Sequence, residues 1–391
     1  MAAPTLALQD VAEQVVLDRR HLHANPELGF QERRTAAFIT ERLCALGLEV
    51  QTGIAETGVV GLLRGVRPGK TVLLRADIDA LPIQEQNDVP YRSQVDGVMH
   101  ACGHDGHTAI LLNTARVLTN RRDRLTGNVK FVFQPSEEAP PGGAVKMIEE
   151  GVLENPRVDA AFGLHLGQNL PLGAIMARPG PISAASDRFQ IDITGKGGHA
   201  ARPHLAVDAA LVSAQVLVGL HTLVAREVNP MLPAVVTVGL IQAGAVSNVI
   251  PETGRLEGTV RTYDPELREM LARRVQEVAT GIAHAMRAEC VCHYQFGYPS
   301  VVNDPAMTEL VAAVAREVID PEHVILGEQG MGGEDFAYFL QHVPGCFFRV
   351  GSRNDERGLI YGHHHPRFDI DEAALPLGIE MFVRVVERYL A

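Results

Sequence analysis

Apolar residues in the first 180 positions recur with two periods, one typical of helices and the other of buried strands. Spacings of three to four predict helices over residues 11–23, 32–46 and about 108–118, the second ending at Gly47 as a C-cap. Runs of four to seven β-branched and apolar residues predict strands at residues 59–63, 71–76, 129–133 and 159–165. Strands that are apolar throughout and separated by helices indicate a largely buried α/β sheet.

The pattern changes at about residue 183. Strand and helix patterns then follow one another at residues 189–194, 207–228, 234–242, 255–262, 265–286 and 289–294. Their order is β-α-β-β-α-β, the split arrangement of a small ferredoxin-like α+β sandwich. Helical patterns return at residues 305–317 and 374–390, with another apolar strand at 346–350.

These two patterns predict two domains. We expect one α/β domain built from both ends of the chain, residues 1–182 and 298–391, interrupted by an inserted α+β domain of residues 183–297. The length of 391 residues suits two domains, and such insertions are tolerated when the ends of the insert lie close together.

Composition narrows the class of function. The chain has 35 Lys and Arg against 47 Asp and Glu, a net charge of −12, which disfavours nucleic acid or an anionic membrane as partner. With 46% hydrophobic and 21% charged residues it can build a sizeable core. Five irregularly spaced cysteines, no signal-peptide pattern at the N-terminus and no run of about 18 apolar residues lead us to expect a cytoplasmic protein.

Three of the predicted strands run directly into polar residues. These residues lie at positions 77–79, at positions 134–138 and at His165. In open α/β sheets, functional sites form outside the carboxyl ends of the strands, so the three strand ends together predict a site. Taken alone, a histidine on an apolar strand is more often a hydrogen-bonded core residue than a ligand.

Residues 99–108, Met-His-Ala-Cys-Gly-His-Asp-Gly-His-Thr, are the segment richest in reactive side chains. Thiolate and imidazole are first-choice ligands of zinc and its late first-row neighbours, and one intervening glycine lets Cys102 and His104 converge on one point. The alternative is a loop that caps the following helix, with Cys102 as a small buried hydrophobe.

Glu137 and Glu138 follow a strand and precede an Ala-Pro-Pro-Gly-Gly turn. Adjacent residues leaving a strand point in different directions, so one carboxylate can bind metal while the other faces a water molecule. That arrangement suits metal-assisted hydrolysis, because a metal lowers the pKa of water from about 15.7 towards roughly 7 and a carboxylate takes its proton. The alternative is that both glutamates belong to a solvated face.

A run of three histidines, His363, His364 and His365, lies too far inside the chain to be a purification tag. One of the three would close a metal site, and their spacing does not say which; the alternative is an exposed polar loop.

In the insert, a glycine-rich turn presents His199, and Asn248 and Arg261 are the other polar candidates. Each of the three alone is more typical of structure than of function. Cys290 and Cys292 alternate onto one face of a strand, which favours core packing over metal binding.

Together these segments resemble the amidohydrolase branch of the aminoacylase/carboxypeptidase family of two-metal peptidases, which includes hippurate hydrolase, N-acyl-L-amino acid amidohydrolase and plant auxin-conjugate hydrolases. The matching segments run in order along nearly the whole chain. They are HLHANPE (21–27), RADIDALP (75–82), MHACGHDGH (99–107), QPSEE (134–138), GKGGHA (195–200), SNVIPE (247–252), EDFAY (334–338) and HHPRFD (364–369).

The resemblance implies that Glu137 is the general base and that five side chains ligate two metal ions. The five are Cys102, His104, Glu138, His165 and His364. His364 is implied because the family ligand stands two residues before the proline, here Pro366, although His365 takes a place where the family often has Ser. Mn²⁺, Zn²⁺, Co²⁺ and Ni²⁺ all remain open, because affinity order and metal availability both bear on occupancy.

For the insert, the resemblance implies a lid and dimerisation domain. His199 would stabilise the oxyanion, often in the active site of the partner subunit, and Asn248 and Arg261 would hold the substrate's carboxylate. A homodimer or homotetramer would form through this domain.

The implied activity is metal-dependent hydrolysis of the amide bond of N-acyl amino acids, hippurate-like or N-acetyl, with a small-molecule substrate and with neither nucleic acid nor membrane as partner. One alternative is a dipeptidase or carboxypeptidase acting on small peptides. Another, of a different class, is a non-catalytic metal-stabilised binding protein. Glu137 weighs against the last, because pure binding needs no second carboxylate beside the metals.

Overall fold

The computed structural model describes residues 9–391, which divide into two compact units. Unit 1 comprises the chain up to Ile182, together with Val302–Glu328 and Asp335–Ala391, and unit 2 comprises Ser183–Val301 and Gln329–Glu334. The division into a catalytic domain of residues 1–182 and 298–391 and an inserted lid and dimerisation domain of residues 183–297 stays a prediction.

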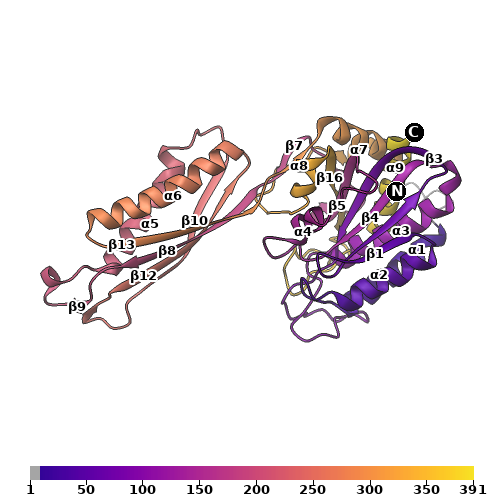
Figure 1. The fold of residues 1–391 in the computed structure, drawn as a ribbon. Helices are drawn as coiled ribbons and strands as arrows, with labels where there is room; N and C mark the ends of the chain where they lie inside the picture. The colour runs from indigo at the N-terminus through magenta and orange to yellow at the C-terminus, as the bar shows by residue number, and fades with distance from the viewer. Residues whose placement is uncertain (1–8) are drawn as a thin grey trace. The chain divides into compact units, whose positions relative to one another are not determined.

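An eight-stranded mixed sheet forms the centre of unit 1 (Figure 1), in the order β1-β2-β4-β3-β5-β16-β6-β15. The strands are β1 (Glu49–Ile54), β2 (Gly58–Arg64), β3 (Arg67–Asp77), β4 (Thr126–Gln134), β5 (Ala160–Pro171), β6 (Ile175–Met176), β15 (Val324–Ile325) and β16 (Gly345–Arg353). β3 is parallel to β4 and β5, and β16 is parallel to β5. The predicted buried α/β sheet is therefore confirmed.

Helices pack against this sheet because packing buries their apolar faces. They are α1 (Gln9–Ala24), α2 (Arg33–Ala45), α3 (His104–Asn120), α4 (Gly143–Glu149), α7 (Pro305–Val318), α8 (Ala337–His342) and α9 (Ala374–Leu390), with one-turn 3-10 helices at Arg122–Arg124 and Pro321–His323. α1, α3, α7 and α9 form one packed group, whereas α4 packs against α8 and β4. Between the sheet and the first group lie fully buried aromatic side chains such as Phe131, Phe162, Phe348 and Phe382.

The register of the parallel strands brings the predicted polar segments to one edge of the sheet. Asp77 at the end of β3 is directly opposite Gln134 at the end of β4, so these two strands end at the same edge of the sheet. His165 differs from the expectation, because β5 continues to Pro171 and His165 lies within the strand, opposite Arg349 of β16. The extra strand length follows from pairing with β16, whose Arg349 is 184 positions from His165 and which local periodicity does not reveal.

Helix α3 also begins earlier than its apolar pattern predicts, at His104 instead of about residue 108. Its N-cap is Gly103, with φ +92°, a backbone conformation that glycine adopts without strain. The earlier start places His104 and His107 in the first turn of the helix.

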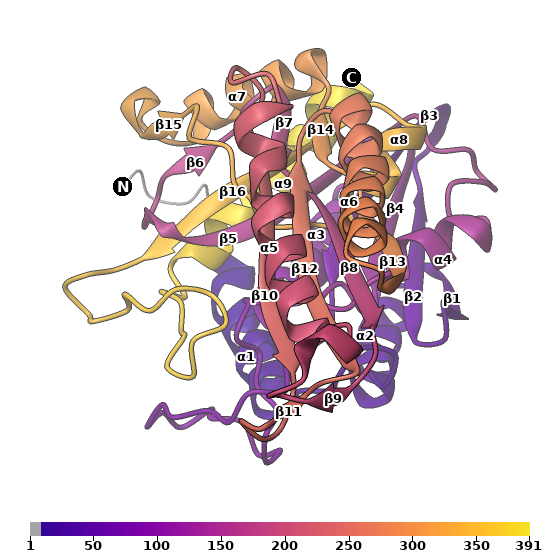
Figure 2. The ribbon, with the colours of Figure 1, turned by 90° about the vertical axis from the view of Figure 1, so that its left-hand side faces the viewer.

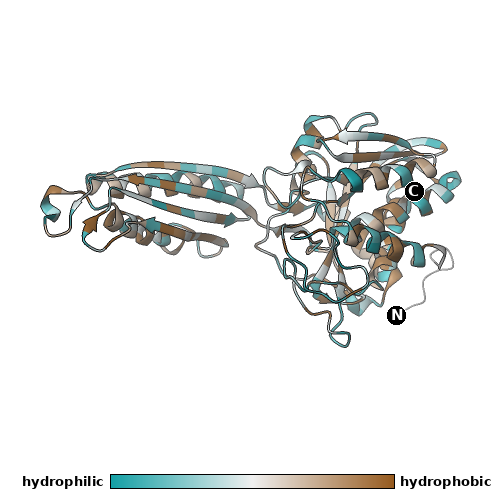
Figure 3. Ribbon diagram, turned by 90° about the horizontal axis from the view of Figure 1, so that it is seen from below, coloured by the Kyte–Doolittle hydropathy of each residue, from teal (hydrophilic) through white to brown (hydrophobic). Residues whose placement is uncertain are grey.

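Unit 2 contains a four-stranded antiparallel sheet, in the order β10-β12-β8-β13, with two helices on one face (Figure 2). Its elements are β8 (Ala185–Thr194), α5 (Ala209–Arg226), β10 (Ala234–Ala243), β12 (Thr253–Thr262), α6 (Pro265–Ala285) and β13 (Glu289–Tyr298). This is the predicted βαββαβ order. Hydrophilic and hydrophobic residues alternate along its strands (Figure 3), and Cys290 and Cys292 pack against the core between sheet and helices, as predicted.

Shorter elements complete the chain. β9 (Gly198–His199) and β11 (Val249–Ile250) form a separate two-stranded ladder in unit 2, and a 3-10 turn lies at Pro203–Leu205. β7 (Gly180–Ser183) and β14 (Val301–Asn303) lie in the sequence where the chain passes between the units.

Among the described residues, α5 is the one helix whose length and composition would let it cross a membrane. Core helices of soluble proteins pass the same test. Six residues of α5 are buried, among them Val216 and Leu220 in the core of unit 2, and the side chain of Asp208 caps its N-terminus.

Candidate metal centre

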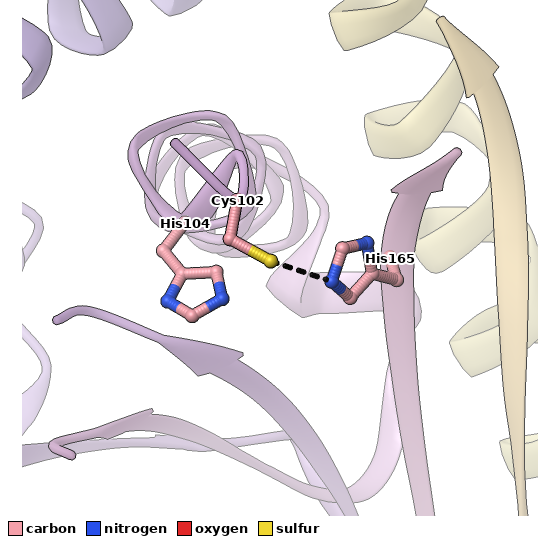
Figure 4. Close-up of side chains that lie close together, drawn as sticks. All are labelled: Cys102, His104 and His165. Atoms are coloured by element: carbon pink, nitrogen blue, oxygen red, sulfur yellow. Dashed lines mark hydrogen bonds between the residues drawn. The ribbon is translucent and has the colours of Figure 1, made fainter. Parts of the chain in front are cut away.

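Cys102, His104 and His165 come together at the edge of the unit 1 sheet (Figure 4). Cys102 and His104 flank the turn that starts α3, and His165 projects from β5. The Cys102 Sγ lies 3.6 Å from the His165 Nε2, and the donor atoms of all three residues lie within 4.8 Å of one another.

A second group of three shares Cys102 with the first. Cys102, Glu138 and His364 also place their donor atoms within 4.8 Å of one another. The His364 Nε2 lies 3.2 Å from the Glu138 Oε1, which in turn lies 3.9 Å from the His104 Nε2. The structure thus brings all five residues of the predicted ligand set to one place.

The three consecutive histidines, which spacing could not separate, take different directions. The His363 Nε2 donates a 2.9 Å hydrogen bond to the Leu166 carbonyl, and the His365 ring stacks on Tyr361. His364 has a left-handed backbone, with φ +65°, and its N–H donates to the Ala101 carbonyl. This conformation turns the His364 side chain, and not its neighbours, towards Glu138.

Hydrogen bonds to the other ring nitrogen orient two of the histidines. The His104 Nδ1 donates to the backbone carbonyl of Asp79 at 2.9 Å and to its Oδ1 at 3.1 Å, and the His165 Nδ1 donates to the Leu166 carbonyl at 2.9 Å. Because Nδ1 carries the donated proton in both rings, Nε2 is the atom that each ring has left to bind a metal. Metal-binding histidines are commonly held in this way by a carboxylate or a carbonyl.

The charges around the centre suit a cation. Burial alone would lower the pKa of His104, but Asp77, Asp79 and Glu138 raise it to about 10. Burial raises the pKa of the Cys102 thiol, and Glu138 and Glu137 raise it further. The pKa shift of His104 reflects the carboxylates around it, whereas that of Cys102 comes first from burial and then from the same negative charge.

Two buried polar atoms at the centre indicate that these residues are suited to binding a metal ion. The His104 Nε2 and the Glu138 Oε1 are buried, and within residues 9–391 neither makes a hydrogen bond, the 3.2 Å approach of the His364 Nε2 to Glu138 being an ion-pair contact. A buried polar atom without a partner is costly, and a cation would satisfy both. Thiolate, imidazole and carboxylate together match the ligand chemistry of zinc and its late first-row neighbours.

Glu137, the predicted general base, lies beside the ligand set. The residue is 7% exposed, and one of its carboxylate oxygens lies within 4.8 Å of donor atoms of His104 and Glu138. It leaves the loop after β4 next to Glu138, so the two carboxylates reach the centre from adjacent residues.

Asp77 and His107 received no role from the sequence alone, although both stand in matching segments. The His107 Nδ1 donates a 2.6 Å hydrogen bond to Asp77, whose other oxygen accepts one from the fully buried Arg75. The spacing of His104 and His107, three residues apart on a helix, is the signal that could have placed them on one face.

In unit 2, the structure brings together two of the three predicted residues. His199 on β9 is directly opposite Val249 of β11, and the N–H of Ala200 donates to the Asn248 carbonyl. Arg261 lies near the far end of β12, eight residues from Thr253, or about 26 Å at 3.3 Å per residue. There the Arg261 Nη1 donates to the carbonyls of Asp187 and Val260.

Comparison with known proteins gives one consistent result. The model of peptidase family M20/M25/M40 matches residues 73–388. The chain is 47% identical over 363 residues to YhaA, a candidate amidohydrolase of Bacillus subtilis (strain 168), covering 93% of this chain and 91% of that protein. It is 42% identical over 372 residues to the N-acetyl-L-cysteine deacetylase of the same strain, covering 94% and 86%.

Among solved structures, YxeP of Bacillus subtilis, described as a dinuclear metal-binding peptidase of the M20 family, matches with a TM-score of 0.85 and 37% identity over 98% of this chain and 99% of that one. The chain therefore belongs to peptidase family M20/M25/M40, which confirms the resemblance and the expected fold. It is a hydrolase of the amidohydrolase type, with a cluster of residues suited to binding metal.

Proposed function

We propose that this protein hydrolyses the amide bond of N-acyl amino acids, hippurate-like or N-acetyl, by means of two divalent metal ions per subunit. The observation that carries the proposal is the convergence in unit 1 of five donor side chains with Glu137 beside them. One relative is named an amidohydrolase and another an N-acetyl-L-cysteine deacetylase, and the second name supports this substrate class.

The ligands fall into two groups that share one sulfur. Cys102, His104 and His165 would hold one ion, and Cys102, Glu138 and His364 the other. Divalent ions held there would lower the pKa of a water molecule and polarise the scissile carbonyl. The donor set is compatible with Mn²⁺, Zn²⁺, Co²⁺ or Ni²⁺.

Glu137 would act as the general base. Its buried carboxylate would take a proton from the attacking water and then pass it to the departing amine, so the same group serves both halves of the reaction. A positioned acid–base group of this kind contributes about 10²–10⁴-fold to the rate.

His199 would donate a hydrogen bond to the oxyanion. The N–H of Ala201 donates to the His199 Nδ1 at 3.1 Å, so the ring proton of the neutral imidazole resides on Nε2. The exposed Nε2–H is then available to an oxygen that becomes negative in the transition state.

Asn248 and Arg261 would hold the substrate carboxylate. Asn248 lies before β12, whereas Arg261 lies eight residues beyond the first residue of that strand, about 26 Å along it, so we expect that one copy of the unit does not bring both to a single amino acid. Their joint contact with one substrate would require two copies of the chain, which favours the homodimer, or a homotetramer, over a monomer. We place this enzyme in the cytoplasm.

A substrate panel on metal-depleted enzyme tests the proposal. N-acetyl amino acids, N-benzoyl amino acids and dipeptides are assayed after chelation and after adding back each divalent metal separately. We expect metal-restored cleavage of the N-acyl amino acids, and loss of nearly all turnover in Glu137→Gln with two metals per chain retained. Preferential cleavage of dipeptides would identify a peptidase, and metal-dependent thermal stability without any turnover would identify a binding protein.

A further inference from the structure

Glu32 occupies the N-cap position of α2 but does not cap its own helix. Its side chain accepts no hydrogen bond from the first turn. Glu27 does so instead, because its carboxylate accepts hydrogen bonds from the N–H groups of Thr35, at 2.9 Å, and Arg34, at 3.2 Å. The carboxylate of Glu32 is therefore left for another partner.

That partner is the loop that carries Glu137. The Glu32 Oε1 accepts a 2.9 Å hydrogen bond from the N–H of Ser136, and its Oε2 accepts one of 2.5 Å from the Thr57 hydroxyl. Glu32 is 0% exposed. Burying a carboxylate is costly unless it is hydrogen-bonded, so these two donors determine where it lies.

Ser136 needs such support. Its backbone has φ +50°, a left-handed conformation that costs a non-glycine residue of order 1 kcal/mol. The Ser136 carbonyl accepts a hydrogen bond from the Gly143 N–H, so the residue is held on both sides. Gly29 packs so closely that a Cβ at that position would lie 2.7 Å from the Ser136 Oγ.

Glu137 thus sits between two peptide groups held by buried carboxylates. On one side Glu32 holds the N–H of Ser136, and on the other the Asp79 Oδ2 accepts the N–H of Glu138 at 3.0 Å. Asp79 also binds His104 and is already part of the candidate metal centre. Within the described residues, the side-chain hydrogen bonds of Glu32 go to Thr57 and Ser136 and to none of the five candidate ligands, so its effect on the site would pass through the loop.

We infer that Glu32 is a positioning residue for Glu137: by holding Ser136 in its left-handed conformation, it aims the Glu137 carboxylate at the centre. This inference rests on the proposed role of Glu137 as general base. Burial raises the pKa of Glu32 to about 7, and in either protonation state one oxygen remains to accept the Ser136 N–H. A displacement of about 1 Å at a reacting group can cost 10²-fold in rate.

Steady-state kinetics on four variants test this inference. Glu32→Ala is expected to lower kcat about 10–100-fold, with KM within about threefold and metal content unchanged. Glu32→Gln should retain most of kcat, because an amide oxygen still accepts the Ser136 N–H. Glu32→Asp, one methylene shorter, replaces the alanine variant if that does not fold. Glu27→Gln is the matched control on the same segment and should behave as wild type.

Combining Glu32→Ala with Glu137→Gln distinguishes a positioning role of Glu32 from a general loss of stability. If Glu32 acts through Glu137, Glu32→Ala causes no further loss of activity there. An equal loss in both backgrounds would overturn the inference, as would a wild-type kcat in Glu32→Ala or Glu32→Asp.

Hydrogen exchange gives a readout that needs no substrate. In a peptide covering residues 134–143, exchange at the Ser136 amide should rise at least tenfold in Glu32→Ala and stay unchanged in Glu27→Gln. If the wild type cleaves no N-acyl amino acid, the proposed function fails while this measurement still decides about Glu32. Unchanged exchange at Ser136 would overturn the inference by itself.

Discussion

The backbone N–H of Leu166 donates a 2.9 Å hydrogen bond to the Nε2 of His107. Since an N–H can only donate, that Nε2 carries no proton, and the ring proton sits on Nδ1, where it is donated to Asp77. His107 therefore has both nitrogens engaged and holds the strand segment next to His165. It supports a candidate ligand without being one itself.

We predict that His107→Ala weakens metal binding about 10–100-fold, the usual cost of removing a partner that orients a ligand. The change leaves the Leu166 N–H and the Asp77 carboxylate without their partner, so β5 can shift beside His165. Competition with a chromophoric chelator measures the affinity.

Asn113→Ala is the matched control for His107→Ala. Asn113 is equally buried on α3, and its side chain donates to Asp18 and to the Ala109 carbonyl. The Asn113→Ala variant should be less stable than the wild type, but its metal affinity should stay within about threefold of the wild-type value. Equal weakening by both variants would mean that helix stability, and not orientation of His165, controls the affinity.

Arg19 joins two segments that carry candidate ligands. Fully buried on α1, it donates 2.7 Å hydrogen bonds to Asp105, next to His104, and to Asp369, five residues after His364. We predict that Arg19→Lys lowers the free energy of unfolding by about 2–4 kcal/mol, because a lysine ammonium cannot span both carboxylates and leaves buried charge incompletely paired.

Arg64→Lys is the comparison for Arg19→Lys. Arg64 pairs with Glu49 on the surface, with side chains 48% and 62% exposed, where solvent screens the attraction. Denaturant unfolding should show a loss below about 1 kcal/mol. If Arg64→Lys lowered the free energy of unfolding as much as Arg19→Lys does, Arg19 would not be the buried link between the Asp105 and Asp369 segments.

Stability should depend on pH through Glu32. Burial raises the pKa of Glu32 from 4.5 to about 7, so the folded protein holds this proton more tightly than the unfolded chain does. The contribution of Glu32 to the free energy of unfolding is therefore fully present below pH 4.5 and is lost as pH rises through 7. Relative to Glu32→Gln, metal-free wild type should lose up to about 3 kcal/mol of unfolding free energy between pH 5 and 8. Parallel pH profiles of the two proteins would contradict this.

Exposed apolar side chains on the outer face of α5 lead us to predict that two copies of the chain associate through it. Leu211 and Val218, seven residues apart, are 52% and 61% exposed, and Val235 and Ile241 are exposed on the neighbouring edge strand β10. We predict that Val218→Asp shifts a dimer to monomer in light scattering at micromolar concentration, whereas Gln276→Asp on α6 leaves it intact. A monomeric wild type would remove the proposed action of His199 across subunits.

Local patterns were sufficient for the order of the main elements and for several of the residues that carry chemistry, although not for every boundary. The βαββαβ order of unit 2, the strands that end at Asp77 and Gln134, and the grouping of Cys102 with His104 all follow from residues a few positions apart. Hydrophobic periods and short ligand spacings are local properties, so a single sequence contains them in full.

The tertiary structure decided what depends on residues far apart. Spacing left three histidines open, and the orientation of His364, which the resemblance implied, rests on a left-handed backbone and a bond to the Ala101 carbonyl. The placement of His165 inside β5 rests on pairing with β16, and the link from Glu32 to Ser136 spans 104 residues. Such contacts are set by how the whole chain packs and by which buried polar groups must find partners, and no local pattern contains that information.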